Sequence, residues 1–91
     1  MAVVTPDGWV NLTDAHSLSN GSEYIVQNRS DEYVAYLEES ADEPTNTDNA
    51  FALAAFGQEG NTTRYSQVSG IDLWATVEFG GVSNVVVKNS F

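Results

Sequence analysis

The chain's only histidine, His16, lies close to Asp14 and Ser17, and these are the residue types of a serine hydrolase triad. A triad needs its members held by rigid elements with an oxyanion site beside them. Here all three fall within one predicted loop, where near neighbours in sequence rarely converge in that geometry. We therefore predict a loop histidine, no catalytic residues and no enzyme activity.

The carboxylates are the second set of residues that could do chemistry. Glu38 and Glu39 are adjacent, and on a strand neighbouring side chains point to opposite faces, so they cannot easily share a proton. Five acidic residues in and beside the loop at 40–49 offer oxygen ligands to calcium: Glu38, Glu39, Asp42, Glu43 and Asp48. Their spacing does not match an EF-hand loop. We expect a solvated acidic loop, with no metal or cofactor site.

Aromatic residues give the clearest candidate for binding. Residues 71–79 alternate strictly between apolar and polar side chains, which predicts a strand with one wet face. Trp74 lies on that wet face with Asp72, so it either contacts another protein or is covered by a loop or by the amino-terminal segment. Trp9 either covers Trp74 or is a second contact. Tyr33 and Tyr36 fall on opposite faces of one predicted strand, so one of the two is left near the surface. The predicted interface residues are Trp74, Asp72, Trp9 and Tyr36.

The elements that must position these residues are short strands. Turn signals recur at roughly the 8–12-residue spacing typical of a sandwich or barrel, and we expect about seven strands between them. The predicted strands cover residues 9–12, 23–28, 33–38, 50–56, 64–68, 71–79 and 84–89. Residues 51–56 are rich in alanine and also compatible with a helical turn, but their length favours a strand. The fold class is all-β, a small antiparallel β-sandwich or jelly-roll-like barrel.

Two turn-type sequences add to this prediction. Gly80-Gly81 follows a strand with no helix after it, which predicts a tight hairpin. The Asn-x-Ser/Thr matches are interpreted as loop chemistry and not as glycosylation sites; they begin at Asn11, Asn20, Asn28 and Asn61.

Length and composition limit the functions that this chain can have. With 91 residues the chain forms a single domain, in which we expect a sandwich over 9–91 and an arm or edge strand over 1–8.

Thirteen acidic residues against three basic ones give a net charge of −10, which argues against nucleic acid and anionic membranes as ligands. The acidity suits either a soluble, salt-adapted surface or a docking surface for a basic partner or divalent cations. No cysteine is present, which excludes disulfides and thiolate metal sites, and we expect neither a signal peptide nor a membrane span.

Four strand and turn patterns stand out along the chain: Gly21-Ser22-Glu23-Tyr24-Ile25-Val26-Gln27-Asn28, Val34-Ala35-Tyr36-Leu37-Glu38-Glu39-Ser40, Leu73-Trp74-Ala75 and Val85-Val86-Val87. Together they resemble a family of small virion proteins of tailed bacterial viruses and their relatives. The likeness covers roughly residues 9–89, although residues 56–61 are more polar than the family pattern, which often has a Pro-Gly pair there. It brings no catalytic residues.

The resemblance implies a capsid decoration or cement protein, located in the virion after assembly in the host cytoplasm. Its partner would be the major capsid protein or another virion protein. We also expect a homo-oligomer, for which a trimer around a local symmetry axis is one arrangement. The alternative is a module of a tail or fibre that binds a host receptor or carbohydrate.

Overall fold

The structure, a computed structural model, describes residues 2–4, 8–30, 32–78, 81 and 83–89. Within these residues the chain forms eight strands and one single-turn helix. The strands are β1 (Ala2–Val4), β2 (Val10–Asn11), β3 (Glu23–Asn28), β4 (Ala35–Ser40), β5 (Phe51–Leu53), β6 (Thr62–Ser66), β7 (Asp72–Val77) and β8 (Ser83–Asn89). The helix α1 (Leu12–Ala15) follows β2 directly.

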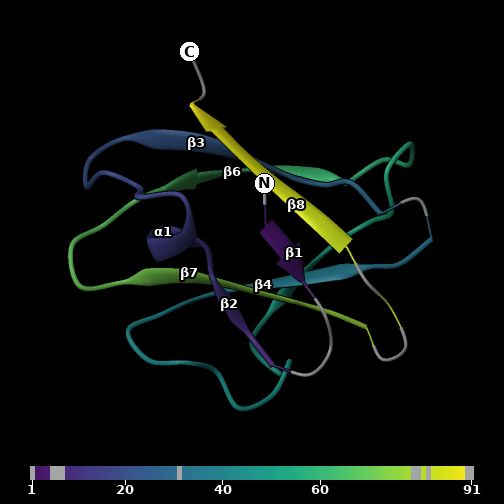
Figure 1. The fold of residues 1–91 in the computed structure, drawn as a ribbon, viewed down its shortest axis with the longest axis horizontal. Coiled ribbons are helices and arrows are strands. Elements are labelled where there is room, and N and C mark those ends of the chain that lie inside the picture. Colours follow the sequence, from purple (N-terminus) through teal and green to yellow (C-terminus); the bar gives the residue numbers. More distant parts are fainter. Residues whose placement is uncertain (1, 5–7, 31, 79–80, 82, 90–91) are drawn as a thin grey trace.

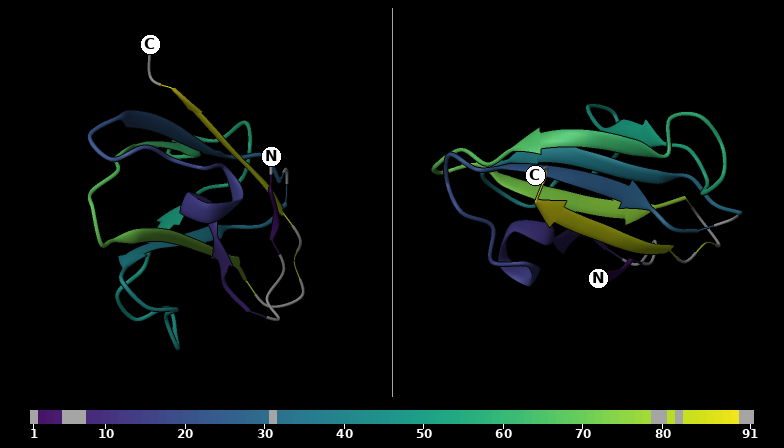
Figure 2. Two further views of the ribbon diagram at one scale, coloured as in Figure 1. Left: turned by 60° about the vertical axis from the view of Figure 1, so that its left-hand side comes forward. Right: turned by 90° about the horizontal axis from the view of Figure 1, so that it is seen from above.

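The strands form two four-stranded antiparallel sheets, in the orders β1-β8-β3-β6 and β2-β7-β4-β5. Figure 1 and the left view of Figure 2 show the sheets as two layers, with β3 and β6 on one side and β7 and β4 on the other. The pairs β1–β8, β2–β7, β3–β6 and β4–β5 are nested in sequence, as if one long hairpin had been rolled up. This is the topology of a jelly roll, which confirms the predicted all-β class.

The core lies between the two sheets and takes alternate residues from each strand. In β3 the inward residues are Tyr24, Val26 and Asn28, and in β7 they are Leu73, Ala75 and Val77. Helix α1 closes one side of the sandwich, because Leu12 is fully buried against this cluster. Period-two alternation therefore produces the core, as expected for half-buried strands.

Most of the predicted strands exist, with shifted ends. The predicted strand at 23–28 has the observed bounds of β3, whereas β4 begins and ends two residues later than predicted. The strand favoured at 50–56 is the shorter β5, and the one at 64–68 is β6, shifted toward the amino terminus. The one predicted at 9–12 is cut short because Asn11 caps α1, its side chain accepting a hydrogen bond from the Asp14 backbone N–H at 3.0 Å. Phe79, at the end of the predicted strand 71–79, lies outside the described residues.

The hairpin predicted at Gly80-Gly81 is wrong. A turn is present, since the Gly81 N–H donates to the Glu78 carbonyl at 2.9 Å. However, β7 and β8 belong to different sheets, so this turn carries the chain from one layer to the other. Gly81 is required there because a Cβ atom would lie 2.7 Å from the Tyr33 ring. Gly80 itself lies outside the described residues.

At the amino terminus, Ala2–Val4 forms an edge strand that pairs with β8. Of the segment predicted as an arm or edge strand, residues 1 and 5–7 lie outside the described part of the chain. No helix in the described residues is long and apolar enough to span a membrane.

Asn28 is a fully buried structural hub and not the loop residue that its Asn-x-Ser sequence suggested. Its side-chain amide donates to the carbonyls of Tyr33, Leu53 and Ala54 at 2.8–3.2 Å. Its side-chain oxygen accepts from the Ser30 N–H and from the Ser83 hydroxyl. This one side chain therefore ties β3 to β5, to the start of β8 and to the segment before β4, across both sheets.

A second buried polar network fixes α1 at the opposite end of β3. Gln67 accepts hydrogen bonds from the hydroxyls of Thr13 and Tyr65, each at 2.9 Å, and donates to the carbonyls of Val68 and Ile71. Thr13 in turn accepts from the Leu73 N–H. Burial raises the pKa of the Tyr65 phenol, which keeps this donor protonated.

Candidate protein-binding face

The four predicted interface residues lie on or beside one sheet surface, the solvent side of β2-β7-β4-β5, which we call the outer face. Alternation along β7 places Asp72, Trp74 and Thr76 there, with Glu78 following. The β4 register sets Tyr36 opposite Thr76 and Glu38 opposite Trp74. Because strand neighbours alternate between faces, Glu39 lies opposite Leu73 on the other side of β4.

The second neighbour of β7 is β2, which brings Trp9 to the same surface. Val10 pairs with Ala75 and Asn11 pairs with Trp74, so Trp9 is next to Thr76 when the register is continued by one residue. Strands in a sheet are about 4.8 Å apart, which places the backbones of Trp9 and Tyr36 about 10 Å apart with Thr76 between them.

One half of the outer face is closed by internal hydrogen bonds. The Trp74 indole Nε1–H donates to the Ser40 carbonyl at 3.0 Å, and the Asn11 amide donates to the Asp72 carboxylate at 3.0 Å. We call this set, Asn11, Ser40, Asp72 and Trp74, the closed half. Trp74 is half-buried, and its one polar atom already has a partner within the chain.

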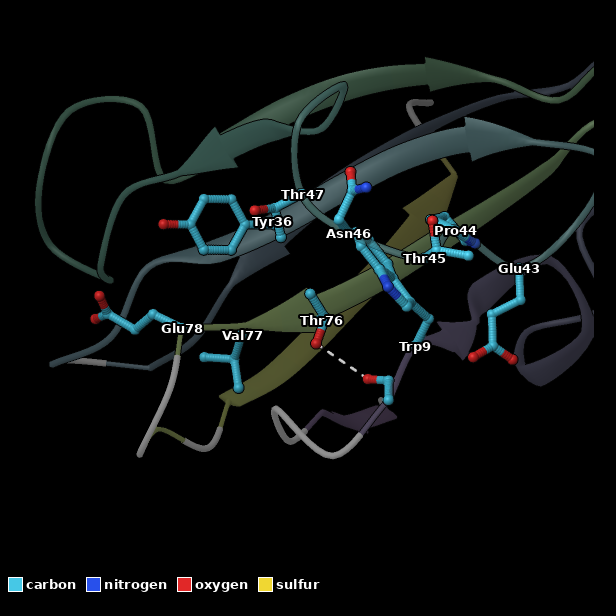
Figure 3. A pocket seen from close by; sticks show the side chains of 11 residues that line it. Trp9, Tyr36, Glu43, Pro44, Thr45, Asn46, Thr47, Thr76, Val77 and Glu78 are labelled. Atoms are coloured by element: carbon cyan, nitrogen blue, oxygen red, sulfur yellow. Dashed lines mark hydrogen bonds between the residues drawn. The ribbon is translucent and has the colours of Figure 1, made fainter.

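The other half opens into a pocket of about 730 Å³ (Figure 3). Its lining comprises Gly8, Trp9, Tyr36, Glu43, Pro44, Thr45, Asn46, Thr47, Thr76, Val77 and Glu78. Figure 3 shows Thr76 between the two aromatic side chains, with the loop at 43–47 passing over the strands. We call this set the open half.

The polar side-chain groups of Trp9 and Tyr36 differ from the indole N–H of Trp74 in their hydrogen bonding. Among the hydrogen bonds of the described residues, none involves the side chain of Trp9 or Tyr36. Both side chains are half-buried and border the pocket. The indole N–H of Trp9 and the hydroxyl of Tyr36 therefore remain available to a ligand.

Two carboxylates lie on opposite sides of the pocket in Figure 3, Glu78 near Tyr36 and Glu43 beyond Trp9. Glu78 is held in place, because its Oε1 accepts from the Val34 N–H at 3.0 Å while its own N–H donates to the Val34 carbonyl. Glu43 is exposed on the loop. The fold supplies one fixed and one adaptable negative charge.

The chain's basic residues all lie away from the outer face. Arg64 is on β6 and pairs with Glu23 at 2.7 Å, Lys88 is on β8, and Arg29 follows β3 and lies 4.3 Å from the Phe56 ring centroid. No described basic residue therefore neutralises the carboxylates of the outer face and its loop, namely Glu38, Asp42, Glu43, Asp48, Asp72 and Glu78. On the described strands, one sheet has Glu23, Arg64 and Lys88, whereas the other has only acidic charges, Glu38, Glu39 and Asp72.

The residues considered for catalysis do not form a site. Within the described chain no hydrogen bond joins the side chains of Asp14, His16 and Ser17. His16 Nε2 is buried without a partner, and burial lowers the pKa of the imidazole because it disfavours the charged form. These three residues lie in and directly after α1, where the sequence predicted a loop.

The acidic residues do not gather around a metal position either. In the described part of the chain, no group of three or more His, Cys, Asp or Glu side chains is arranged to hold a metal ion. The carboxylates in and beside the loop at 40–49 are spread along it instead of converging.

Of the pocket residues, Trp9 and Tyr36 were predicted from the sequence as interface residues. Thr76 and Glu78 were placed by alternation on the same wet face as Trp74, but they were not predicted as interface residues. Glu43 and Asn46 could not be found from the sequence, because the path of a ten-residue loop across a sheet has no signal in local sequence.

No protein-family model, curated protein or solved structure matches the chain. Its function is therefore inferred from its own residues, their placement on the two sheets and the distribution of charge.

Proposed function

We propose that this chain is a structural protein of a virus particle, a cement or decoration protein that binds the outer capsid surface and bridges neighbouring capsid subunits. The observation that carries the proposal is the outer face, which combines two aromatic side chains with unused polar tips and a set of carboxylates without basic neighbours. Aromatic residues in pockets are frequent anchors of protein interfaces, and charge complementarity selects the partner.

The mechanism on this proposal is mechanical. A protein that binds only the assembled shell stabilises it by mass action, by about 2.7 kcal/mol per site when its free concentration is 100 times the Kd. Binding across two capsid subunits adds this free energy to the cost of separating them. A homo-oligomer would add further bridging contacts, because each copy would engage its own capsid site.

Two further features support the same proposal. The strand and turn patterns resemble small virion proteins, as described above, and Trp74 and Asn28 of those patterns make side-chain hydrogen bonds within this fold. Jelly rolls also occur in virus capsid subunits and in lectins. A shared fold does not determine function, so this second feature is supporting only.

Quantitative mass spectrometry of purified virus particles tests the proposal. A cement protein is expected in a copy number comparable with that of the major capsid protein, and it should leave the particle before the shell breaks when salt is raised. Absence of the chain from intact particles would contradict the proposal.

The alternative is a tail or fibre module that binds a host receptor or carbohydrate. The open half favours it in one respect, because aromatic faces beside amide, hydroxyl and carboxylate groups can bind sugar rings: Trp9, Tyr36, Asn46, Thr47 and Glu78. A copy number far below that of the capsid protein would select this alternative.

A further inference from the structure

The open half has the chemical groups that bind a cation. Trp9 and Tyr36 offer aromatic faces, whose negative quadrupole attracts cations, and Tyr36 also offers a hydroxyl oxygen. Glu78 and Glu43 supply negative charge on opposite sides of the same pocket (Figure 3). A group that contacts both aromatic residues would thus lie between two carboxylates.

The charge of the pocket lining limits the class of ligand that can bind there. No basic side chain lines the pocket, and the three basic residues of the chain lie on or beside the other sheet. A neutral ligand would leave both carboxylates uncompensated, whereas a cation neutralises them on binding. A metal ion fits poorly, since no group of three carboxylate or histidine ligands occurs in the described residues.

We infer that the pocket between Trp9 and Tyr36 binds an arginine side chain presented by a basic segment of the partner protein. This inference rests on the proposed function, because it names the partner chemistry of the same face. The guanidinium is planar and can stack on an aromatic ring while its N–H groups donate to a carboxylate. The chain already contains such a stack internally, since the Arg29 guanidinium carbon lies 4.3 Å from the centre of the Phe56 ring.

The placement of Glu78 fits this role. Its Oε1 is fixed by the Val34 N–H at 3.0 Å, which orients the carboxylate at the side of Tyr36 before any ligand arrives. Glu43 lies on the exposed loop and can close on the ligand from the side of Trp9. Arginine is also enriched among interface hot spots, so one seated side chain can dominate docking.

A titration of the isolated full chain with Nα-acetyl-arginine amide tests the inference, with backbone amide and indole N–H resonances followed by NMR. We expect saturable shifts concentrated at Trp9, Tyr36, Thr76 and Glu78, and weaker binding as salt rises. The citrulline analogue, which has the same shape without the charge, should bind at least about fivefold more weakly.

Matched variants locate the site. Glu43→Gln and Glu78→Gln should each weaken arginine binding about two- to fivefold, and Trp9→Leu by a similar factor. Glu59→Gln removes the same charge from an exposed loop away from the pocket and should leave the affinity unchanged. Thermal unfolding of each variant shows whether the fold is retained.

Three outcomes would overturn the inference. Arginine amide causes no saturable shift at the pocket, or the citrulline analogue binds equally well, or methyl glycosides bind there more tightly than arginine amide. These results are distinct from failure of the proposed function, since the pocket can bind arginine in a chain that is absent from virus particles, and a virion protein can lack arginine binding.

Discussion

The two halves of the outer face carry similar residues but use them in opposite ways. In the closed half, Trp74 donates its indole N–H to Ser40 and Asp72 accepts from Asn11. In the open half, Trp9 and Tyr36 border a pocket and make no side-chain hydrogen bond within the described chain. A tryptophan on the solvent side of a strand can therefore be a structural residue, as Trp74 is. Trp9, which lies beside the neighbouring strand β2, is the better candidate for binding.

The difference arises from the end of β4 and the loop that follows it. The carbonyl of Ser40, the last residue of β4, accepts from the Trp74 indole, and in the loop residues 43–47 pass over the strands and form the border of the pocket. The strand end thus closes one half of the face, and the loop shapes the other. For Trp74 the sequence left open a contact with another protein or a cover within the chain, and its indole N–H has its partner within the fold. We therefore propose Trp9 and Tyr36 as the binding residues.

The largest effect is expected at Asn28, the hub whose hydrogen bonds join the two sheets. Asn28→Ala should lower the free energy of unfolding by about 3–5 kcal/mol, because several buried carbonyls lose their donor. Urea denaturation measures this loss. Asn20→Ala, at an exposed turn, should change stability by less than about 0.5 kcal/mol. An equally small effect at Asn28 would show that its hydrogen bonds do not hold the sheets together.

The matched pair Trp74→Phe and Trp9→Phe tests the comparison directly. Both variants keep an aromatic ring and lose the indole N–H. Trp74→Phe should destabilise the fold by about 1–2 kcal/mol, since the Ser40 carbonyl loses its donor and some packing is lost, whereas Trp9→Phe should cost clearly less. Chemical denaturation of the two variants gives both values, and equal losses would remove the distinction between the halves.

Asn11 and Asn46 provide a second pair, with a smaller effect. Asn11→Ala removes the cap of α1 and the donor to Asp72, and should cost about 1 kcal/mol. Asn46→Ala removes only a local bond from the Asp48 N–H in the exposed loop and should cost less than about 0.5 kcal/mol. A larger loss at Asn46 than at Asn11 would reverse the assignment of closed and open halves.

The smallest effect concerns pH and His16, which follows α1 beside the closed half. Burial lowers the pKa of His16, so the unfolded chain binds a proton more readily than the folded one. Stability contributed by neutral His16 is present above about pH 6.5 and is lost as pH falls toward the folded pKa, by at most about 1.4 kcal/mol per pH unit. Urea denaturation at neutral and mildly acidic pH measures the slope, which His16→Gln should flatten. An unchanged slope would place the imidazole in solvent.

The sequence predicts the parts of this molecule that depend on local pattern. Strict alternation at 71–79 assigned the described residues of β7 to the correct faces, and the run from Glu23 to Asn28 gave the bounds of β3. Local pattern could not show that β7 and β8 lie in different sheets, because pairing is decided by contacts distant in sequence. For the same reason it could not show that Asn28 is buried or that the loop after β4 borders a pocket.

Cryo-electron microscopy of native virus particles that carry the chain tests whether the outer face is the surface that docks on the capsid. We expect density for this domain on the capsid exterior, with β2-β7-β4-β5 turned toward the capsid protein and a basic side chain between Trp9 and Tyr36. A domain attached through the β1-β8-β3-β6 sheet, with the pocket facing solvent, would contradict it.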